Sequence, residues 1–397
     1  MSRRFGLVDW RDLNHRAGDL LARTGFPEID PRATVANLGV AYRQIVEIAK
    51  GLSENGSVLF LDEPTSVLAP QEVENLFAAL RILREQGVGL VYISHRLDEI
   101  FRIADRITVL KDGAVVRTVC PAEITPGDLI GLMIGRTLTA MFPHRDSRAG
   151  AEVLRVEALN RGGKVRDVSF AVRAGEIVGI AGLVGSGRTE ILRTIFGADP
   201  KDGGTISVGG RRLRIHSPRD AVLNGIALVP ESRKDHGVIL NMSIRKNITL
   251  PSIGRLAGAL GIIRQRKERS VAQTLAGKLG IKTRSIEAEV ADLSGGNQQK
   301  VVLAKWLGTD CRVLLLDEPT RGVDVGAKAE LYRLISDLAG GGLAIVMVSS
   351  EMMELIGLCD RVAVVNRGRI AGVLEGAAIT EENIMRLAVQ KGTGGIG

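Results

Sequence analysis

An internal repeat runs through this chain of 397 residues. The segment VLFLDEPTSVL at Val58–Leu68 recurs as VLLLDEPTRGV at Val313–Val323, so Asp62 corresponds to Asp317 at an offset of 255 positions (317 − 62). The same offset relates Leu38 to Leu293, Gln44 to Gln299, Ser94 to Ser349, Asp105 to Asp360 and Gly113 to Gly368. A register that holds from about Val35 to about Val115 indicates two copies of one structural unit.

Each copy alternates helical patterns with short apolar runs. The expected helices are Ala41–Leu52 and Glu72–Gln86 in copy one, and Gln298–Leu307 and Gly326–Ala339 in copy two. The expected buried strands that follow are Gly89–Ile93 and Leu343–Val348. Continuous Val, Ile and Leu runs between helices predict an α/β fold, with a mostly parallel sheet covered on both faces.

Copy two has more sequence before its repeated segment than copy one. Val153–Leu159 and Val168–Val172 alternate like half-exposed strands, and Glu176–Ala181 reads as a buried strand that enters a Gly-rich turn. A helical insert is expected at about Ile244–Ile281. The counterpart of the turn at Gly182 would lie upstream of Met1, so we expect copy one to begin in its middle, within its own helical insert.

These patterns predict four segments. Residues 1–140 form a partial first unit, 141–151 a linker, 152–391 a complete second unit and 392–397 a flexible Gly-rich tail. The linker is expected where Pro143, Asp146, Ser147 and Gly150 interrupt the periodicity. Glycines at a chain end favour disorder.

Composition excludes several classes of protein. No apolar run approaches the roughly 18 residues that a membrane-spanning helix needs. Cys120, Cys311 and Cys359 lie far apart without a CxxC spacing, which favours reduced thiols over a disulfide framework or a zinc site. The net charge of +8 is compatible with nucleic acid or an anionic membrane surface. We interpret its densest cluster, Arg264, Arg266, Lys267 and Arg269, as a solvated helix face.

A phosphate-binding loop is predicted at residues 182–189. The sequence GLVGSGRT fits GxxxxGK[ST] except that Arg188 replaces Lys, and it follows a strand and opens a helix at Thr189–Phe196. Glycines let backbone N–H groups surround phosphate oxygens, and a helix N-terminus favours negative charge. The Thr189 hydroxyl is the expected Mg²⁺ ligand. Arg188 keeps the charge, but its planar guanidinium is bulkier than an ammonium group. The alternative is a Gly-rich turn that binds no ligand.

A second glycine motif and an acidic strand end follow. LSGGNQQK at Leu293–Lys300 opens a helix, where Ser294 and the N–H groups of Gly295 and Gly296 can meet a γ-phosphate presented by another domain. The alternative is a Ser N-cap followed by a Gly turn. At the end of Val313–Leu316, Asp317 is expected to hold Mg²⁺ through water, and Glu318 to polarise the attacking water as general base.

In this order the motifs resemble those of ABC ATPases, and more closely the tandem sugar-importer ATPases of the ribose/galactose/xylose type. The phrases that carry the resemblance are GLVGSGRTE at 182–190, LSGGNQQKVVLAKWL at 293–307, LLLDEPTRGVDVGAK at 314–328, VEIAKGL at 46–52 and ISHRLDEIFRIADRITVL at 93–110. They span nearly the whole chain. The resemblance implies two ABC-type P-loop NTPase cassettes in tandem, the first of them incomplete.

The resemblance also implies a function and partners. The chain would be the ATP-binding, ATP-hydrolysing subunit of an ABC importer that energises uptake of a sugar, with ATP and Mg²⁺ as cofactors. Its partners would be integral-membrane permease subunits and, through them, an extracytoplasmic sugar-binding protein, with no nucleic acid. Its place would be the cytoplasm, peripheral on the inner face of the plasma membrane.

The family motifs assign roles to individual residues. Glu318, Glu63 and the switch histidine His95 are the expected catalytic residues, and Thr189 and Asp317 the expected Mg²⁺ ligands. Nucleotide contacts are expected from Gly182, Gly185, Ser186, Gly187, Arg188, Thr189, Glu190, Glu231, Ser294, Gly295, Gly296, Gln298, Asp317, Asp62 and the D-loop residue Asp324. Glu231 stands where the family has Gln.

The chain departs from the family pattern at several places. Copy two has Ser350 at the switch position, and copy one has Gly39, Val40 and Ala41 where copy two has Ser-Gly-Gly. No aromatic residue lies between Glu152 and Asn160 to stack on adenine. Nucleotide binding with slow turnover is the expected consequence. Two alternatives stay open: a catalytically impaired pseudo-ATPase fragment of the family, and a non-transport twin-cassette ATPase acting on nucleic acid or ribosomes.

Overall fold

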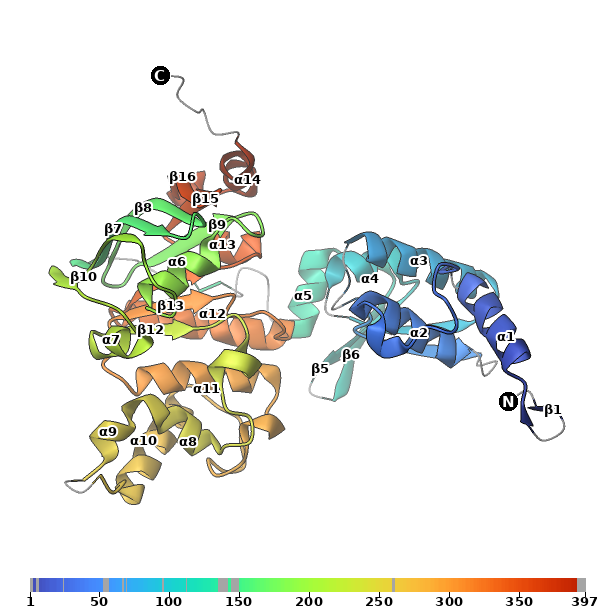
Figure 1. The fold of residues 1–397 in the computed structure, drawn as a ribbon, viewed down its shortest axis with the longest axis horizontal. Helices are drawn as coiled ribbons and strands as arrows, with labels where there is room; N and C mark the ends of the chain where they lie inside the picture. Colours follow the sequence, from blue (N-terminus) through green and yellow to red (C-terminus); the bar gives the residue numbers. More distant parts are fainter. Residues whose placement is uncertain are drawn as a thin grey trace. The chain divides into compact units, whose positions relative to one another are not determined.

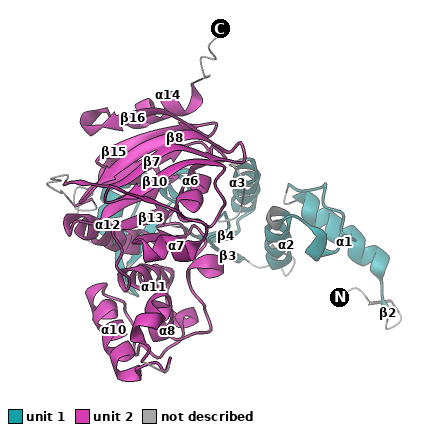
Figure 2. Cartoon of the chain, turned by 60° about the vertical axis from the view of Figure 1, so that its left-hand side comes forward, with its two compact units in different colours: residues 1–133 teal, residues 134–397 magenta. Residues whose placement is uncertain are grey.

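The structure is a computed structural model that describes residues 3–4, 7–23, 25–52, 57–65, 68, 70–94, 96–111, 113–134, 142–143, 150–258 and 261–390. The chain divides into two compact units, residues 1–133 and 134–397 (Figure 2). His95 and the predicted tail at residues 392–397 lie outside the described residues. None of the described helices is long and apolar enough to cross a membrane.

Unit 2 is built on a six-stranded sheet (Figure 1). Its order is β12 (Ile226–Val229), β13 (Val313–Asp317), β14 (Ala344–Val348), β9 (Ile177–Gly182), β15 (Arg361–Asn366) and β16 (Arg369–Glu375). The first five strands are parallel and β16 is antiparallel. Every residue of β12, β13 and β14 is buried. This confirms the predicted α/β architecture, in which continuous apolar strands are covered on both faces.

A second, antiparallel sheet completes the upper part of unit 2. Its order is β11 (Arg211–Leu213), β10 (Gly203–Val208), β7 (Glu152–Arg161) and β8 (Val165–Arg173). The half-exposed strands predicted at Val153–Leu159 and Val168–Val172 are β7 and β8. Both strands alternate buried with exposed positions, because one face packs on the core and the other meets water.

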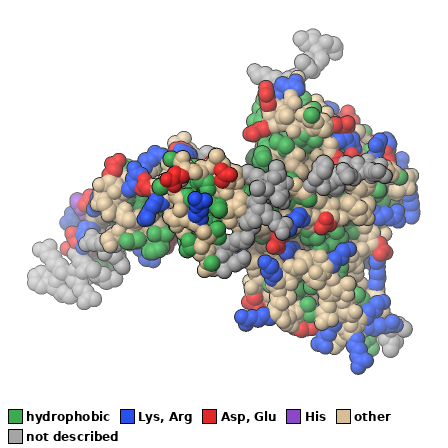
Figure 3. Space-filling model, turned by 180° about the vertical axis from the view of Figure 1, so that it is seen from behind, with side chains coloured by type: hydrophobic (Ala, Val, Ile, Leu, Met, Phe, Trp, Pro, Cys, Tyr) green, Lys and Arg blue, Asp and Glu red, His purple; other side chains and the backbone are tan. Residues whose placement is uncertain are grey.

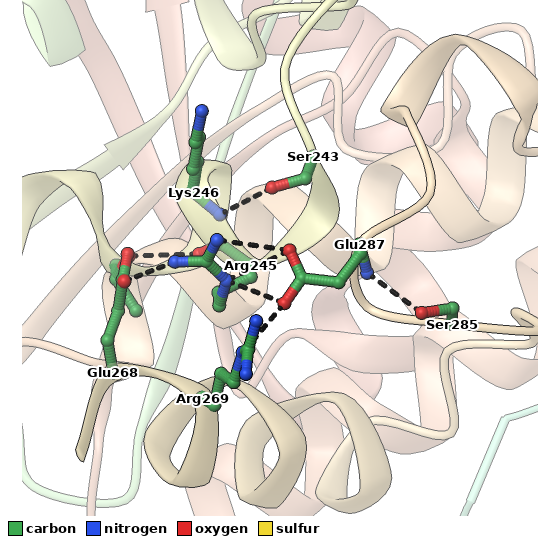
Figure 4. Close-up of polar contacts among 8 residues, drawn as sticks. Ser243, Arg245, Lys246, Glu268, Arg269, Ser285 and Glu287 are labelled. Carbon is green, nitrogen blue, oxygen red and sulfur yellow. Dashed lines mark hydrogen bonds and ion pairs between the residues drawn. The ribbon is translucent and has the colours of Figure 1, made fainter. Parts of the chain in front are cut away.

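The predicted helical insert comprises α8 (Ile244–Thr249), α9 (Ile253–Leu256) and α10 (Gln265–Lys278). Arg245 of α8 lies between Glu268 and Glu287, at 2.9 Å from Glu287, and Arg269 reaches the same Glu287 at 3.1 Å (Figure 4). The other cations of the basic cluster, Arg264, Arg266 and Lys267, are exposed. The cluster is therefore a solvated helix face, as expected. On the face drawn in Figure 3, Lys and Arg side chains are interspersed with Asp and Glu.

Unit 1 repeats the second half of unit 2 element by element. Its helices α2 (Val40–Leu52), α3 (Pro70–Glu85), α4 (Leu97–Ile103) and α5 (Pro126–Ile134) begin and end 255 positions before α11 (Gly295–Leu307), α12 (Val325–Gly340), α13 (Met352–Leu358) and α14 (Glu381–Val389). Ahead of them, α1 (Trp10–Arg23) forms a helix in the region expected to be helical. A core around Leu76, Phe77 and Leu80 of α3 packs these elements together.

The strands of unit 1 differ from the expected single sheet. β3 (Val58–Asp62) pairs in parallel with β4 (Gly89–Ile93), and β5 (Ile107–Lys111) pairs antiparallel with β6 (Ala114–Val119). In unit 2 the equivalent pairs are joined because β9 lies between β14 and β15. Among the described residues of unit 1, no strand lies between β4 and β5.

Candidate nucleotide-binding site

The turn that follows β9 has a backbone that glycine is required to form. Gly182 has φ +152° and Gly187 has φ +106°, and a Cβ on either would lie 2.4 Å from a backbone oxygen, that of Val365 or of Lys164. Gly185, between them, also has positive φ, at +78°. The turn opens directly into α6 (Arg188–Ile195). The predicted strand–loop–helix unit is thus present, with the N-terminus of α6 directed into the loop.

Ser186 lies at the centre of this loop with its hydroxyl unsatisfied. The side chain is buried, and its oxygen has no hydrogen-bond partner among the described residues. Buried polar atoms almost always have a partner, so an orphaned hydroxyl in a Gly-rich loop at a helix N-terminus is a place for a ligand oxygen. An anionic phosphate oxygen has the matching chemistry.

Arg188 turns toward the end of β14. Its Nη1 donates to the carbonyl oxygen of Ser349 at 2.8 Å, and its Nη2 lies 3.8 Å from Oε1 of Glu318. Both side chains are nearly buried, with 10% and 12% exposed. Arg188 therefore also balances the negative charge of Glu318. A lysine at this position would have a single ammonium group and could not contact Glu318 and Ser349 with the same geometry.

Thr189 in the first turn of α6 contacts Asp317 at the end of β13. The Thr189 hydroxyl donates to Oδ1 of Asp317 at 3.1 Å, and Asp317 is 2% exposed. Burial raises the pKa of Asp317 to about 6; the Thr189 hydrogen bond opposes this, while the charge of Glu318 adds to it. A hydroxyl and a carboxylate are oxygen donors of the kind Mg²⁺ prefers, with phosphate oxygens and water as further ligands. The two residues fit the predicted metal site.

Glu318 is held in a strained conformation. Its φ is +47°, a region that side chains rarely adopt, and its N–H donates to the carbonyl of Val348 at 3.0 Å. Oε2 accepts two hydrogen bonds from Ser350, one from the backbone N–H at 3.0 Å and one from the hydroxyl at 2.9 Å. Ser350 thus occupies the position where the family pattern predicts a histidine.

Packing within unit 2 restricts the two glycines of the signature motif, the LSGGNQQK segment at Leu293–Lys300. A Cβ on Gly295 would lie 2.7 Å from Nη2 of Arg233, and one on Gly296 would lie 2.6 Å from Cβ of Ala327. Ser294 is the N-cap residue of α11, and its hydroxyl accepts from Asn297 at 3.0 Å. Gln298 is buried and donates to the carbonyl oxygens of Val290 and Leu293, at 3.2 and 3.1 Å.

Sequence reasoning missed the role of Arg233. Its Nη1 and Nη2 donate to the carbonyl oxygens of Arg321 and Gly322 at 2.7 and 2.8 Å, and its Nε donates to Oε1 of Gln298 at 3.4 Å, so it joins the signature to the D-loop segment. The signal available was only a basic stretch after β12. In the same segment, Glu231 forms an ion pair with Arg321, and Asp324 caps α12 by accepting from the N–H of Ala327 at 2.9 Å.

The structure therefore brings together one part of the predicted site. Ser186, Arg188, Thr189, Asp317 and Glu318 share the edge where β9, β13 and β14 end. Glu190, next along α6, pairs with Lys164 at 2.9 Å. The signature at the start of α11 lies with Arg233 and Gly322, and no hydrogen bond or ion pair between described residues links it to the phosphate loop.

Unit 1 reproduces the acidic strand end. Glu63 has φ +48°, and its N–H donates to the carbonyl of Ile93 at 2.9 Å, which matches the geometry of Glu318. Asp62 is exposed, whereas its counterpart Asp317 is buried beside Thr189 of α6. The position equivalent to Ser294 is Gly39, where a Cβ would meet no atom within 4 Å.

A buried glutamate behind each acidic strand end was also missed. Glu354 accepts from Ser349 at 2.5 Å, from Tyr332 at 2.7 Å and from Thr320. Burial, with the charge of Glu351 next, raises the pKa of Glu354 despite these three donors. The network holds two segments beside Glu318, because Thr320 lies two residues after Glu318 and Ser349 directly follows β14.

Unit 1 contains the same network with one exchange. Glu99 accepts from Thr65 at 2.7 Å, from Tyr92 at 2.8 Å and from Ser94 at 3.4 Å. The tyrosine now comes from a strand, because Tyr92 corresponds to Met347, whereas the counterpart of Tyr332 is Phe77. The two rings of unit 1 pack edge to face at 6.2 Å. The repeat offset contains the signal for this network, but only three-dimensional contacts reveal that the donors converge.

Comparison with known proteins places these features in a family. The ABC transporter family profile matches residues 165–321. Two solved ATP-binding cassettes of ABC transporters, one of them nucleotide-free, superpose with TM-scores of 0.51 and 0.53 at 18% and 19% identity. Each comparison covers 60% of this chain and 99–100% of the cassette. Unit 2 thus has the fold of a P-loop nucleotide-binding cassette of the ABC type.

Relatives define the family more narrowly. The chain is 52% identical to ribose import ATP-binding protein RbsA 3 of Rhizobium meliloti (strain 1021), over 97% of this chain and 77% of that protein. It is 51% identical to a putative ribose/galactose/methyl galactoside import ATP-binding protein of the same organism, over 97% and 77%. It is 48% identical to RbsA of Geobacillus kaustophilus (strain HTA426), over 97% and 78%. The chain belongs to this family of sugar-import ABC ATP-binding proteins.

Proposed function

We propose that this chain is the ATP-binding and ATP-hydrolysing subunit of an ABC importer that takes up a ribose-type or galactose-type sugar. The observation that carries the proposal is the edge formed by β9, α6 and β13. There a glycine loop holds an unpartnered buried hydroxyl at Ser186, next to the Thr189–Asp317 pair. Names given to proteins about 50% identical supply the transported class, sugars.

The residues of this edge receive distinct roles. The backbone of the loop Gly182–Gly187 and the hydroxyl of Ser186 bind the phosphates, with Arg188 as the neighbouring positive charge. Thr189 and Asp317 hold Mg²⁺, which would neutralise charge on the phosphates. Glu318 positions and polarises the attacking water. Permease subunits, an extracytoplasmic sugar-binding protein and a place on the inner membrane face complete the proposal by analogy with importers.

The proposal extends to unit 1 as a second, partial cassette in tandem. Its support is the register of helices and strands at a constant offset, together with the shared geometry of Glu63 and Glu318. Asp62 and Glu63 would act in unit 1 as Asp317 and Glu318 do in unit 2, with His95 as switch residue. Ser294, Gly295, Gly296, Glu231 and Asp324 would act at the contact with another cassette, and Gln298 would support the signature from within.

Equilibrium binding of a fluorescent ATP analogue with Mg²⁺ tests the central assignment. Arg188→Ala should weaken binding about tenfold, which corresponds to about 1.4 kcal/mol. Arg193→Ala is the matched control, because Arg193 lies on the same helix but pairs with Asp199 at 2.9 Å. It should change affinity by less than about twofold. If the unmodified chain and Arg188→Ala bind the analogue with equal affinity, the loop is not part of the binding site.

A specific observation also favours the catalytically impaired alternative. Ser350 stands at the switch position and donates to the carboxylate that should polarise water. The two forms of the proposal share nucleotide binding and differ in turnover, so a steady-state phosphate-release assay separates them.

A further inference from the structure

An aromatic ring from the segment ahead of β7 packs on the helices of unit 2. The ring of Phe142 stacks on that of Tyr332 in α12, with the ring centroids 5.0 Å apart and the planes inclined by 19°. Tyr332 is 1% exposed, whereas Phe142 is half-buried. Stacked aromatic pairs contribute stability beyond the area that they bury. The stack therefore gives this segment a defined point of attachment within unit 2.

Gly357 of α13 provides the space for the Phe142 ring. A Cβ on Gly357 would lie 2.4 Å from Cγ and Cδ1 of Phe142 and 2.7 Å from Cδ2. Because Cγ does not move when the ring turns about its own axis, such a turn cannot relieve the overlap. Glycine inside a helix costs stability relative to alanine. The ring, and not the helix, therefore accounts for a glycine here, and we call the surface formed by Tyr332 and Gly357 the aromatic seat.

Unit 1 covers the equivalent ring with a side chain of its own. Phe77 corresponds to Tyr332 in the repeat, and Arg102 corresponds to Gly357. The guanidinium carbon of Arg102 lies 5.1 Å from the centroid of the Phe77 ring, and its Nη2 donates to Glu74 at 2.7 Å. A cation over the face of an aromatic ring is a favourable contact. The ring is thus covered in both units, and the glycine of unit 2 leaves room for a ring from another segment.

Hydrogen bonds connect the aromatic seat to the phosphate loop. The hydroxyl of Tyr332 donates to Glu354 at 2.7 Å, and Glu354 also accepts from the Ser349 hydroxyl at 2.5 Å. The carbonyl oxygen of Ser349 in turn accepts from Nη1 of Arg188 at 2.8 Å. A continuous series of contacts therefore joins Phe142 to the arginine of the loop.

The same hydrogen bonds respond to the position of the Tyr332 ring. Glu354 is 1% exposed, and a buried carboxylate needs each of its donors. Removal of the Phe142 ring would open one face of Tyr332 to water, which can then compete for its hydroxyl. Glu354 would be left to its donors Thr320 and Ser349, which flank the acidic strand end. Their rearrangement would move the Ser349 carbonyl.

We propose that Phe142 is a positioning residue of the candidate nucleotide-binding site. Its ring on the aromatic seat keeps the Tyr332 hydroxyl on the buried glutamate. That glutamate holds Ser349, whose carbonyl oxygen orients Arg188 at the phosphate loop. An empty seat leaves Arg188 less well oriented for a phosphate. This role rests on the proposed nucleotide binding at Arg188, whereas the seat itself does not.

A double-mutant cycle in the full chain tests the seat, with urea unfolding followed by the fluorescence of Trp306 in α11. Gly357→Ala should lower the unfolding midpoint, because the added methyl group displaces the Phe142 ring. In a Phe142→Ala background the same substitution should raise the midpoint, as alanine does at ordinary helix positions. An effect of the same sign in both backgrounds would show that the ring does not occupy this seat.

Affinity for a fluorescent ATP analogue with Mg²⁺ tests the positioning role. Phe142→Ala should weaken binding about fivefold, while Phe142→Tyr, which keeps a ring to stack, should bind within about twofold of the unmodified chain. Phe170→Ala is the matched control: it removes another half-buried ring, from β8, and should leave the affinity unchanged. Tyr332→Phe keeps the stack and removes the hydroxyl. In that background Phe142→Ala should still lower stability but no longer change affinity.

Two results overturn the positioning role: equal affinity of Phe142→Ala and the unmodified chain, or an equal loss of affinity with and without the Tyr332 hydroxyl. Arg188→Ala distinguishes this failure from that of the proposed function. If Arg188→Ala weakens binding and Phe142→Ala does not, nucleotide binding stands and Phe142 serves only the fold. If neither variant weakens binding, both assignments fail. Should Phe142→Ala not fold, as judged by circular dichroism, Phe142→Leu, which fills the seat without a flat ring, replaces it in each comparison.

Discussion

Glu318 accepts two hydrogen bonds from Ser350, through its backbone N–H at 3.0 Å and its hydroxyl at 2.9 Å. Both reach the same carboxylate oxygen, while the other oxygen faces Arg188 at 3.8 Å. If Glu318 has the proposed role, a water that attacks the γ-phosphate would compete for a carboxylate that already has partners. A serine hydroxyl is also shorter than the imidazole that the family pattern places there, so Ser350 would reach a γ-phosphate less well.

The first prediction concerns turnover. Purified chain should hydrolyse ATP about 100-fold or more below the 1–100 s⁻¹ usual for phosphoryl transfer, since each missing donor to the transferred group costs on the order of 10²–10³. Ser350 replaces one such donor, and Gly39 replaces the hydroxyl of the signature in copy one. Because this rate is already near background, Glu318→Gln should lower phosphate release only slightly further. A rate of about 1 s⁻¹ that Glu318→Gln abolishes would contradict this.

The second prediction uses the strained backbone of Glu318. At φ +47° glycine is favoured over any side chain, by roughly 1 kcal/mol. Glu318→Gly should therefore unfold at a higher urea concentration than Glu318→Ala, although both lose the same carboxylate contacts. Fluorescence of Trp306, which is nearly buried in α11, reports unit 2. At an ordinary helix or strand position alanine would be the more stable of the two.

Unit 1 provides an internal control for that experiment. Glu63 has φ +48° at the equivalent place, so Glu63→Gly should again exceed Glu63→Ala in stability. Hydrogen exchange of β3 and β4 amides, followed by mass spectrometry, reports unit 1 separately. If alanine proves as stable as glycine in both units, the positive φ carries no strain and the conclusion fails.

Features formed by residues close together in the sequence could be predicted, whereas contacts between residues far apart in the sequence could not. The phosphate loop is local: strand, glycines and helix lie within 19 residues of one another, from Ile177 to Ile195, and a pattern of residue types describes them. The repeat offset then correctly placed the elements of unit 1. Arg233 and Gly322 are 89 positions apart, and no local sequence pattern around either residue predicts the hydrogen bond between them.

One further feature lay beyond pattern reasoning. The direction of the Gln298 side chain depends on packing, and the structure turns it inward to two carbonyls although it belongs to a signature motif. Predicting that direction requires knowledge of the neighbours in space.

The third prediction follows from the raised pKa of Asp317, about 6. The folded chain takes up this proton at a higher pH than the unfolded chain, so the carboxyl favours folding at low pH and loses that contribution as pH rises through about 6. Asp317→Asn should therefore stabilise the Mg²⁺-free chain at pH 7.5, by up to roughly 3 kcal/mol, and have less effect at pH 5.

Mg²⁺ favours the opposite protonation state of Asp317. The metal requires the ionised carboxylate, so the gain in ATP-analogue affinity on adding Mg²⁺ should shrink as pH falls from 7.5 to 5.5. In Asp317→Asn the gain should be small at both values. Asp62→Asn, at the exposed counterpart position, should leave the gain in unit 2 and its pH dependence unchanged. If the increase in affinity on adding Mg²⁺ does not depend on pH in the unmodified chain, Asp317 is not a ligand of the metal.

The fourth prediction exploits the exchange of tyrosines between the two buried glutamate networks. Tyr92→Met gives unit 1 the residue found at the equivalent position of unit 2, and it deprives Glu99 of a donor at 2.8 Å. Glu99 is 2% exposed, so the loss should cost about 1–3 kcal/mol of stability in unit 1. Adding Phe77→Tyr completes the arrangement of unit 2, in which Tyr332 reaches Glu354 from a helix at 2.7 Å.

The double variant should recover at least half of the lost stability, measured by hydrogen exchange of the β3 and β4 amides. Phe77→Tyr alone is the matched control: it adds a hydroxyl where Tyr92 already satisfies the carboxylate, so it should be neutral or slightly destabilising. A coupling energy near zero in this cycle would mean that the two hydroxyls act on different groups. The opposite result would show that one buried carboxylate sets the ends of β3 and β4, and that the repeat preserved the hydrogen bond while changing the element that supplies it.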